Sequence, residues 1–322
     1  MSRVEWHPYE FRPGRVSKRF KTSQQVLQNR LDQIADAYIL ARLDSAEPNS
    51  ENMSVNNCET LVDIHCHLIP GIDDGAKSSE EALAMARIAV DDGISTIIAT
   101  PHQLGNFAHN SGQSIRQRTA ELQALLDAEG VPLKVLPGAD VRIEPDMVDR
   151  LISGDVLTLG DHGRHVLLEL PHEIYFPLER VLENLHANGM IGILSHPERN
   201  QGLLKQPELF GPLVERGCLM QVTAGSLMGT FGGQSQSIAE WMIQQSLVHF
   251  VATDAHGHKS RRPLLSRALH RVAQLTDQDF AVHLCCRNPA AVADGVDLDD
   301  HSPIAPKPPS KQSSWFGWAK SA

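Results

Sequence analysis

The sequence is poor in aromatic residues and has no long apolar run. Phe, Trp and Tyr make up only 5% of its 322 residues. No segment approaches the roughly 18 consecutive apolar residues that a membrane-spanning helix needs. The basic N-terminus is not followed by an apolar segment, so no secretory signal is predicted. These absences predict a cytoplasmic protein without direct membrane insertion.

Cysteine and positive charge are also scarce. The five cysteines lack the spacing of a disulfide framework, which favours reduced thiols. No cysteine has an arginine six positions later, so the Cys-x5-Arg loop of cysteine-dependent phosphatases is absent. Asp and Glu (39) exceed Lys and Arg (29), which gives a formal net charge of −10 and argues against a nucleic-acid partner.

Short apolar segments alternate with helical patterns through the middle of the chain. The predicted strands cover residues 61–64, 96–99, 134–137, 166–170, 192–194, 219–222 and 248–252. Ser78 with Glu81, and Ser237 with Glu240, predict capping boxes at two helix starts. Strands that alternate with helices indicate a parallel sheet. About seven such units favour an α/β barrel over two separate domains.

Composition divides the chain into three zones. Residues 61–296 are predicted to form the single barrel domain. Residues 1–60 are polar and are predicted to be an N-terminal extension, either partly helical or disordered, or an artefact of the assigned start. Residues 297–322 are rich in Pro and Ser, which predicts a disordered tail.

Side chains that bind metal ions follow most of the predicted strands. In an α/β barrel the C-terminal ends of the strands meet at one mouth, so these residues are expected to gather there. The set is His65, His67, Asp74, His102, Asp140, Glu169, His196, Asp254 and His256. His-x-His and Asp-x-His each place two ligands on one face of an extended segment. Because a structural zinc site uses about four ligands, this larger set predicts two to three ions with open positions for water and substrate.

Two arginines are expected above this cluster. Arg199 follows His196 by three residues, and Arg262 follows His256 by six. A guanidinium group there can bind two phosphate oxygens at once. The alternative for each arginine is a surface ion pair. The combination of metal ligands and arginines favours the chemistry of phosphate esters.

The motifs DIHCH, DDGAKS, TPH, GAD, LLEL, SHPER, ATDAH and RRP occur in this order over residues 62–293. This order resembles the PHP (polymerase and histidinol phosphatase) superfamily and, within it, the manganese-dependent protein-tyrosine phosphatases of bacterial capsule and exopolysaccharide loci. The resemblance implies a distorted (β/α)7 TIM-like barrel with a metal cluster at the C-terminal ends of the strands. It implies two to three ions, with Mn(2+) first and Fe, Zn, Co or Mg as alternatives.

The resemblance also implies which residues bind which ion. In that assignment His65, His67 and Asp254 hold one ion, Glu169 and His196 hold a second, Asp140 bridges these two, and Asp74, His102 and His256 hold the third. Arg199, Arg262 and Asp74 are the predicted catalytic residues, and the two arginines would bind the phosphoryl group. The family usually has Glu where this chain has Asp140. The shorter side chain predicts a weaker bridge or an adjusted backbone.

The implied activity is hydrolysis of phosphotyrosine on a protein. The implied partner is an autophosphorylated bacterial tyrosine kinase of polysaccharide synthesis and export, and a homo-oligomer is compatible with the resemblance. A small-molecule phosphomonoesterase of histidinol-phosphate or sugar-phosphate type would share the metal ligands. A nuclease fits the acidic balance poorly, and an amidohydrolase often has a bridging Lys that is not found here. A further alternative is a catalytically weak regulatory or binding protein, and Asp140 is the only sequence feature that supports it.

Overall fold

The computed structural model describes residues 60–298. The strands are β1 (Leu61–Cys66), β2 (Ile94–Ala99), β3 (His102–Gln103), β4 (Lys134–Pro137), β5 (Asp140–Arg142), β6 (His165–Glu169), β7 (Ile191–Ser195), β8 (Leu219–Thr223) and β9 (Phe250–Ala252). All seven predicted strands are confirmed, and every ladder between them is parallel. Nearly all of the predicted N-terminal extension and of the predicted tail lies outside the described residues.

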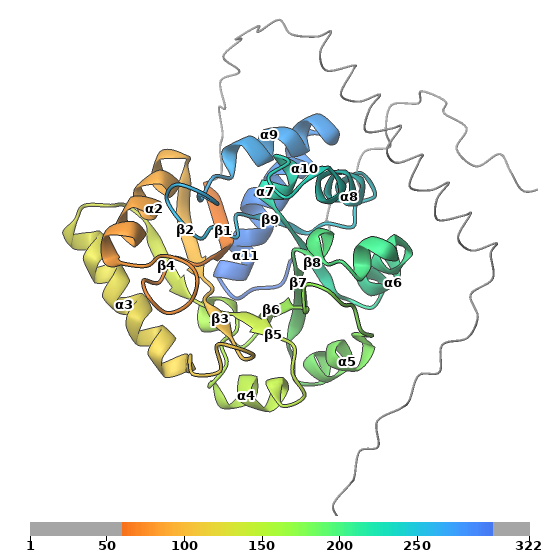
Figure 1. The fold of residues 1–322 in the computed structure, drawn as a ribbon, viewed down its shortest axis with the longest axis horizontal. Coiled ribbons are helices and arrows are strands. Elements are labelled where there is room, and N and C mark those ends of the chain that lie inside the picture. The colour runs from red at the N-terminus through yellow and green to blue at the C-terminus, as the bar shows by residue number, and fades with distance from the viewer. Residues whose placement is uncertain (1–59, 299–322) are drawn as a thin grey trace, which may run out of the picture. The chain divides into compact units, whose positions relative to one another are not determined.

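Helices follow the strands and lie around them (Figure 1). The α-helices are α2 (Ser79–Asp91), α3 (Gly112–Ala128), α4 (Met147–Ser153), α5 (Glu179–Ala187), α6 (Phe210–Glu215), α7 (Ala224–Leu227), α8 (Gly233–Gln244), α9 (Ser266–Leu275), α10 (Gln278–Val282) and α11 (Asn288–Ala293). Short 3-10 turns are η1 (Leu159–Asp161), η2 (Pro197–Arg199), η3 (Leu203–Lys205) and η4 (Pro207–Leu209), and η5 (His283–Arg287) is a π-helical turn. None of these helices is both long and apolar enough to cross a membrane.

The N-cap half of one predicted capping box is confirmed, but its Glu81 carboxylate accepts from the Lys77 amide at 3.0 Å. The Ser78 hydroxyl accepts a hydrogen bond from the Glu81 amide at 3.3 Å and begins α2. The prediction at Ser237 is wrong, because α8 already begins at Gly233. The Ser237 hydroxyl instead donates to the Gly233 carbonyl at 2.8 Å, as a serine inside a helix can.

The strand pairing differs from the predicted closed barrel. The strands form two parallel sheets, in the orders β1-β2-β4 and β3-β5-β6-β7-β8-β9. The break falls where Thr100 and Pro101 separate β2 from β3, because Pro101 has no amide hydrogen to donate to a ladder. At the other edge, a single parallel bridge between Cys66 and Ala255 joins the two sheets within the described chain. The fold is therefore a mixed α/β fold with parallel sheets.

Two apolar clusters hold the strands in place. The larger cluster lies between the strands and the helices around them. The smaller cluster includes Ile64 of β1, Ile193 of β7, Phe250 of β9 and Val292 of α11. Helix α11 packs against β1, behind the strands in Figure 1. This apolar packing leaves the C-terminal ends of the strands free to carry polar groups.

Candidate metal centre

Strand ends, together with the loop after β1 that carries Asp74, bring all nine predicted ligands together. His65 lies in β1 and His67 just after it, His102 and Asp140 begin β3 and β5, Glu169 ends β6, His196 follows β7, and Asp254 and His256 follow β9. They form four overlapping groups within which the ligand atoms lie no more than 4.8 Å apart. The groups are His65, His67, Asp140; His65, His196, Asp254; His102, Asp140, Glu169; and His67, Asp74, His102, His256. The cluster thus joins residues from both sheets.

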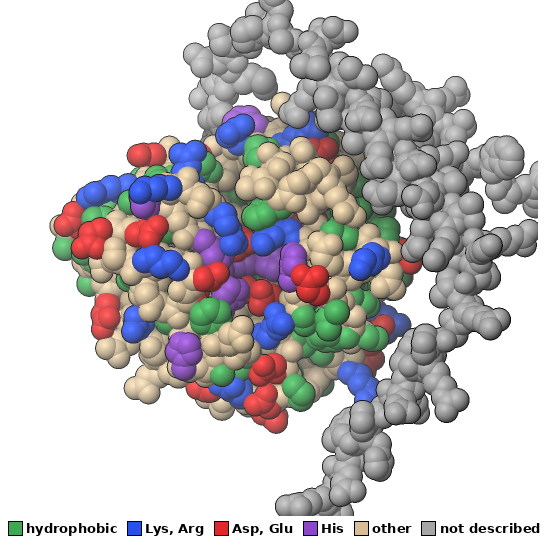
Figure 2. Space-filling model, in the orientation of Figure 1, with side chains coloured by type: hydrophobic (Ala, Val, Ile, Leu, Met, Phe, Trp, Pro, Cys, Tyr) green, Lys and Arg blue, Asp and Glu red, His purple; other side chains and the backbone are tan. Residues whose placement is uncertain are grey.

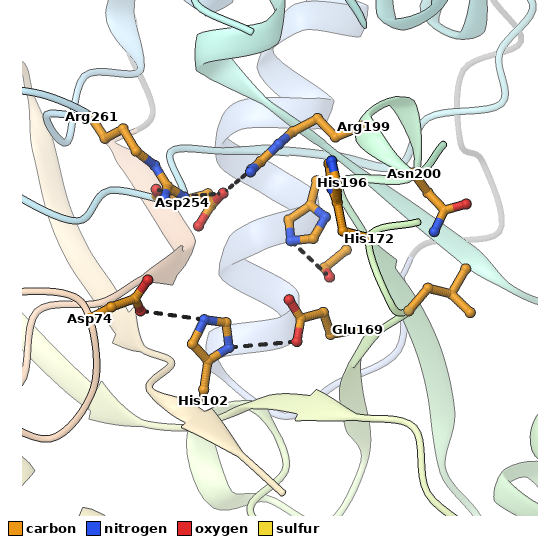
Figure 3. A pocket seen from close by; sticks show the side chains of 11 residues that line it. Asp74, His102, Glu169, His172, His196, Arg199, Asn200, Asp254 and Arg261 are labelled. Atoms are coloured by element: carbon orange, nitrogen blue, oxygen red, sulfur yellow. Dashed lines mark hydrogen bonds and ion pairs between the residues drawn. The ribbon is translucent and has the colours of Figure 1, made fainter. Parts of the chain in front are cut away.

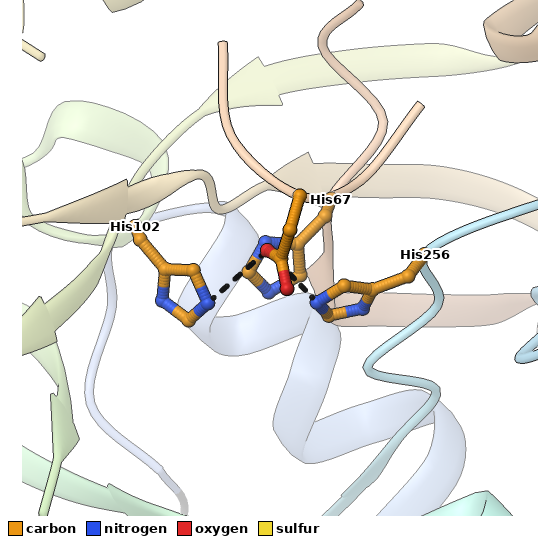
Figure 4. A group of neighbouring side chains, drawn as sticks. His67, His102 and His256 are labelled. Carbon is orange, nitrogen blue, oxygen red and sulfur yellow. Dashed lines mark ion pairs between the residues drawn. The ribbon is translucent and has the colours of Figure 1, made fainter. Parts of the chain in front are cut away.

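The close groups overlap the implied sets only in part, because Glu169 is grouped with His102 and Asp140 whereas His196 is grouped with His65 and Asp254. The Nε2 atoms of His65 and His67 are 3.3 Å apart, and each lies 3.4 to 3.6 Å from Oδ1 of Asp254. Asp74 Oδ1 is 3.5 Å from Nε2 of both His102 and His256. Figure 4 shows His102 and His256 on either side of one carboxylate, with His67 between them. The geometry therefore supplies more than one place where imidazole and carboxylate atoms converge.

Two buried hydrogen bonds orient the central imidazoles. His65 Nδ1 is 2.8 Å from Oε1 of Gln221, and His67 Nδ1 is 2.8 Å from Oδ2 of Asp73. Because Nδ1 of each ring is occupied, Nε2 faces the centre, which is the arrangement that outer partners impose on metal-binding histidines. Sequence reasoning missed both partners. Asp73 had a signal in the DDG motif, whereas Gln221 had none beyond its place near the end of β8.

The backbone is strained where two ligands follow their strands. His196 and Asp254 have positive φ angles of 34° and 50°. Non-glycine residues avoid this region, and such strain often lies at functional sites. The Asp254 amide donates to the His65 carbonyl at 2.7 Å, which holds the loop after β9 against β1. The carboxylate of Asp63 accepts from the Thr253 amide at 2.9 Å and reinforces the same junction.

Burial keeps several of these groups in the state that a metal site uses. Burial, with Arg199 nearby, lowers the pKa of His196 to about 3. Burial, with His256 nearby, lowers the pKa of His67 to about 4. Both rings are therefore neutral near pH 7, and the neutral ring is the form that binds metal. Glu169 differs, because burial and the neighbouring Asp140 raise its pKa to about 7 and so favour the protonated form over the carboxylate that binds metal.

Asp140 provides the observation that tests whether metal ions fit. Its side chain is fully buried and has no hydrogen bond of good geometry within the described residues, although Oδ2 lies 3.3 Å from Nδ1 of His102 and 3.7 Å from Nε2 of His65. Burial acts to raise its pKa, but His65 and His102 hold it well below the usual range, so the group is charged. A buried carboxylate is costly unless cationic groups balance it, and metal ions would add to the balance that the neighbouring imidazoles provide. The imidazole and carboxylate donors around it fit divalent ions of the Mn, Fe, Zn and Co type.

A cavity of about 250 Å³ opens beside the cluster (Figure 3). It is lined by Asp74, His102, Glu169, Leu170, His172, Ser195, His196, Arg199, Asn200, Asp254 and Arg261. Figure 3 shows Arg199 and Arg261 on the side opposite His102 and Glu169. In Figure 2 the histidines gather in a hollow near the middle of the face, with basic side chains beside them. The lining therefore combines predicted metal ligands with two guanidinium groups, and Asp254 lies beside both arginines.

The arginine near His256 is not the predicted one. Arg261 Nη2 lies 2.6 Å from Oδ2 of Asp254, whereas Arg262 is exposed and does not line the cavity. The physical reason is local: Arg261 has a φ of 48°, and its carbonyl accepts from the His256 amide at 2.9 Å. This tight turn directs Arg261 toward Asp254. Arg199 is placed as expected and pairs with the same carboxylate.

Parallel strands with a cluster of imidazole and carboxylate groups at one edge define an α/β protein with a candidate metal site. Within this class, residues 61–294 match the family model for capsular polysaccharide synthesis, CpsB/CapC. The chain therefore belongs to the CpsB/CapC family.

Curated relatives of the chain are named as phosphatases. It is 39% identical over 212 residues to the tyrosine-protein phosphatase YwqE of Bacillus subtilis, covering 65% of this chain and 83% of the relative. It is 26% identical over 238 residues to the tyrosine-protein phosphatase CpsB of Streptococcus pneumoniae, covering 72% and 98%. A solved structure, from work on YwqE and CpsB as unique metal-dependent tyrosine phosphatases, superposes with a TM-score of 0.70 at 33% identity. That match covers 77% of this chain and all of the other.

Proposed function

We propose that this chain is a metal-dependent protein-tyrosine phosphatase. Its substrate is phosphotyrosine on a protein, and the partner is an autophosphorylated bacterial tyrosine kinase of polysaccharide synthesis and export. The observation that carries the proposal is the cavity in which the ligand cluster faces Arg199 and Arg261. The named activity of its relatives supports the same reading.

The proposed ligands are the nine residues of the cluster, which bind two to three ions, with Mn(2+) first. Such ions supply Lewis acidity and lower the pKa of coordinated water. Arg199 and Arg261 bind the non-bridging oxygens of the phosphoryl group and balance its charge. Both guanidinium groups already pair with the Asp254 carboxylate, so both reach one anionic group in the cavity. The phenol that leaves has a pKa of roughly 10 and needs little help from an acid.

We also propose that the two sheets form one distorted (β/α)7 barrel within residues 61–296. The support is that β2 and β3 are separated by two residues, as are β4 and β5, so each pair counts as one interrupted strand. The bridge between Cys66 and Ala255 then joins β1 to the segment after β9. This arrangement directs the C-terminal ends of seven strands to the same mouth.

The test is the activity of metal-stripped protein after Mn, Fe, Zn, Co or Mg is added back in turn. A phosphotyrosine peptide and histidinol phosphate serve as parallel substrates. Turnover of the peptide that returns with manganese supports the proposal. A preference for histidinol phosphate would overturn the substrate, and no turnover with any metal would overturn the activity.

The adjacent arginines supply a matched pair of variants. Arg261→Ala removes a guanidinium from the cavity and is expected to lower kcat/KM by about 10²-fold. Arg262→Ala removes an exposed side chain and is expected to leave kcat/KM within about twofold of the parent. Equal losses from both variants would show that the structural assignment of Arg261 is wrong.

A further inference from the structure

Phe231 contacts both arginines of the cavity, although no motif in the sequence singled it out. The Cζ atom of Arg199 lies 4.0 Å from the centroid of the Phe231 ring, and that of Arg261 lies 5.7 Å from it. Both distances are within the range at which an aromatic face attracts a cation. The same two guanidinium groups pair with Asp254. The Phe231 ring and the Asp254 carboxylate thus contact the same pair of arginines.

The chain fixes this ring through α7. Glu198 precedes Arg199, is fully buried, and accepts from the Thr223 amide at 3.0 Å and the Ser226 hydroxyl at 2.6 Å. These bonds hold the start of α7 against the turn that carries Arg199. Gly225 of α7 lies so close to the ring that an added Cβ would be 2.8 Å from its Cε2 atom.

The residue after the ring shows the same constraint. Gly232 has a φ of 90°, a conformation that side-chain-bearing residues rarely adopt. It makes the turn between Phe231 and α8. The position of the ring is therefore set by α7 on one side and by a glycine turn on the other.

We propose that Phe231 is a positioning residue for both phosphate-binding arginines. The inference rests on the proposed function, since it assumes that Arg199 and Arg261 bind a phosphoryl group. An aromatic face attracts a guanidinium without occupying its N–H donors, which lie in the guanidinium plane. A carboxylate in the same place would occupy those donors and cancel the charge. Phe231 therefore holds the two groups in place without occupying a donor, so that the donors not taken by Asp254 remain for the phosphate.

The first test compares Phe231→Leu with Phe231→Tyr in the manganese-loaded full chain. Leucine keeps an apolar side chain but has no aromatic face, whereas tyrosine keeps the face. We expect Phe231→Leu to weaken the binding of inorganic phosphate, measured by calorimetry, and to lower kcat/KM for an aryl phosphate, each by about 5- to 30-fold. Phe231→Tyr should restore both values to within about twofold of the parent.

A control substitution separates this effect from a general loss of packing. Phe280→Leu changes a buried aromatic residue of α10 that does not line the cavity. Per folded molecule it should leave phosphate affinity unchanged. Unchanged phosphate affinity in Phe231→Leu would overturn the proposal, and so would an equal loss in Phe231→Tyr.

A double-mutant cycle assigns the effect to the arginines. In the Arg199→Ala background, Phe231→Leu should cost less than about threefold in phosphate affinity, because only the more distant Arg261 remains over the ring. A full, additive loss in that background would contradict the proposed route. If the parent binds phosphate but hydrolyses no ester, the proposed function fails while the phosphate measurements still decide the role of Phe231.

Discussion

The two ends of the same parallel strands differ in what they bury. At the C-terminal ends the chain buries charged and polar groups and has left-handed backbone at His196 and Asp254. At the other end, apolar residues such as Leu159 and Val292 form a cluster beneath the strands. Left-handed non-glycine residues also occur before strands, at Asp161 and Ser246, but those at His196 and Asp254 belong to predicted ligands. We infer that apolar packing in the smaller cluster offsets the free-energy cost of burying polar and charged groups at the candidate site.

Strand β6 shows the contrast within five residues. It begins at His165 and ends at Glu169. Burial, with Arg164 nearby, lowers the pKa of His165 to about 4, and burial raises the pKa of Glu169 to about 7. Glu169 lies within the ligand cluster, whereas neither ring nitrogen of His165 has a hydrogen-bond partner in the described part of the chain. Glu169 has other ligand atoms around it, whereas His165 is a neutral ring in the core.

The largest expected effect comes from removing a ligand at the C-terminal end. His65→Ala should lower kcat/KM by at least about 10³-fold, because it removes an atom shared by two of the ligand groups. The melting temperature of the metal-free variant should change by only a few degrees, since the apolar cluster remains intact. Steady-state kinetics and thermal unfolding measure the two effects. His186→Ala, at an exposed position of α5, is the matched control, and near-normal turnover in His65→Ala would contradict the metal site.

The opposite pattern is expected from the apolar end. Leu159→Ala should lower the free energy of unfolding by about 2 to 5 kcal/mol, because it leaves a cavity in the smaller apolar cluster. Activity per folded molecule should stay within about twofold of the parent. Chemical denaturation and kinetics on the same sample test both statements. If activity per folded molecule falls together with the free energy of unfolding, the apolar cluster and the candidate site are coupled, and the comparison fails.

Acid should affect the buried histidine of β6. His165 has a pKa of about 4 in the folded chain against 6.5 as its ordinary value. The unfolded chain therefore binds more protons between these values, so stability is full above about pH 6.5 and falls as the pH drops toward 4. The difference corresponds to about 3 kcal/mol. His165→Phe should remove this part of the acid sensitivity.

Urea unfolding of metal-free protein at several pH values measures that effect. The parent and His165→Phe should differ in free energy of unfolding by a growing amount from pH 7 to pH 4. His186→Gln, which changes an exposed histidine, should follow the parent. Parallel curves for the parent and His165→Phe would show that His165 is not kept neutral by burial.

The sequence predicted the strands and the ligand cluster because both depend on local patterns. Short apolar segments define the strands, and parallel strands direct the residues that follow them to one edge. The same rule does not tell which of two adjacent residues faces the site. Arg261 rather than Arg262 does so because of a positive φ angle that composition and spacing do not reveal. The break between β2 and β3 had a visible signal in Pro101, but its effect depends on the partner strand.

Residues that position other site residues had the weakest signals in the sequence. Phe231 is a single aromatic residue in a glycine-rich turn, and its contact with Arg199 joins segments that lie far apart in the sequence. Gln221 lies in the apolar strand β8 and contacts His65, a predicted ligand in β1. Pairings of this kind follow from the tertiary arrangement, which local periodicity does not encode.

Gln221 gives the smallest of these predicted effects and the sharpest test of how the two ends differ. Gln221→Leu removes the acceptor for His65 Nδ1 and should weaken Mn(2+) binding by about 10- to 100-fold, because the ring loses the bond that orients it. Gln221→Glu keeps an acceptor and should retain affinity within about threefold of the parent. Calorimetric titration of metal-free protein measures both. His165 is accommodated in the core without a hydrogen bond, whereas His65 is expected to need one to serve as a ligand. Unchanged Mn(2+) affinity in Gln221→Leu would contradict that difference.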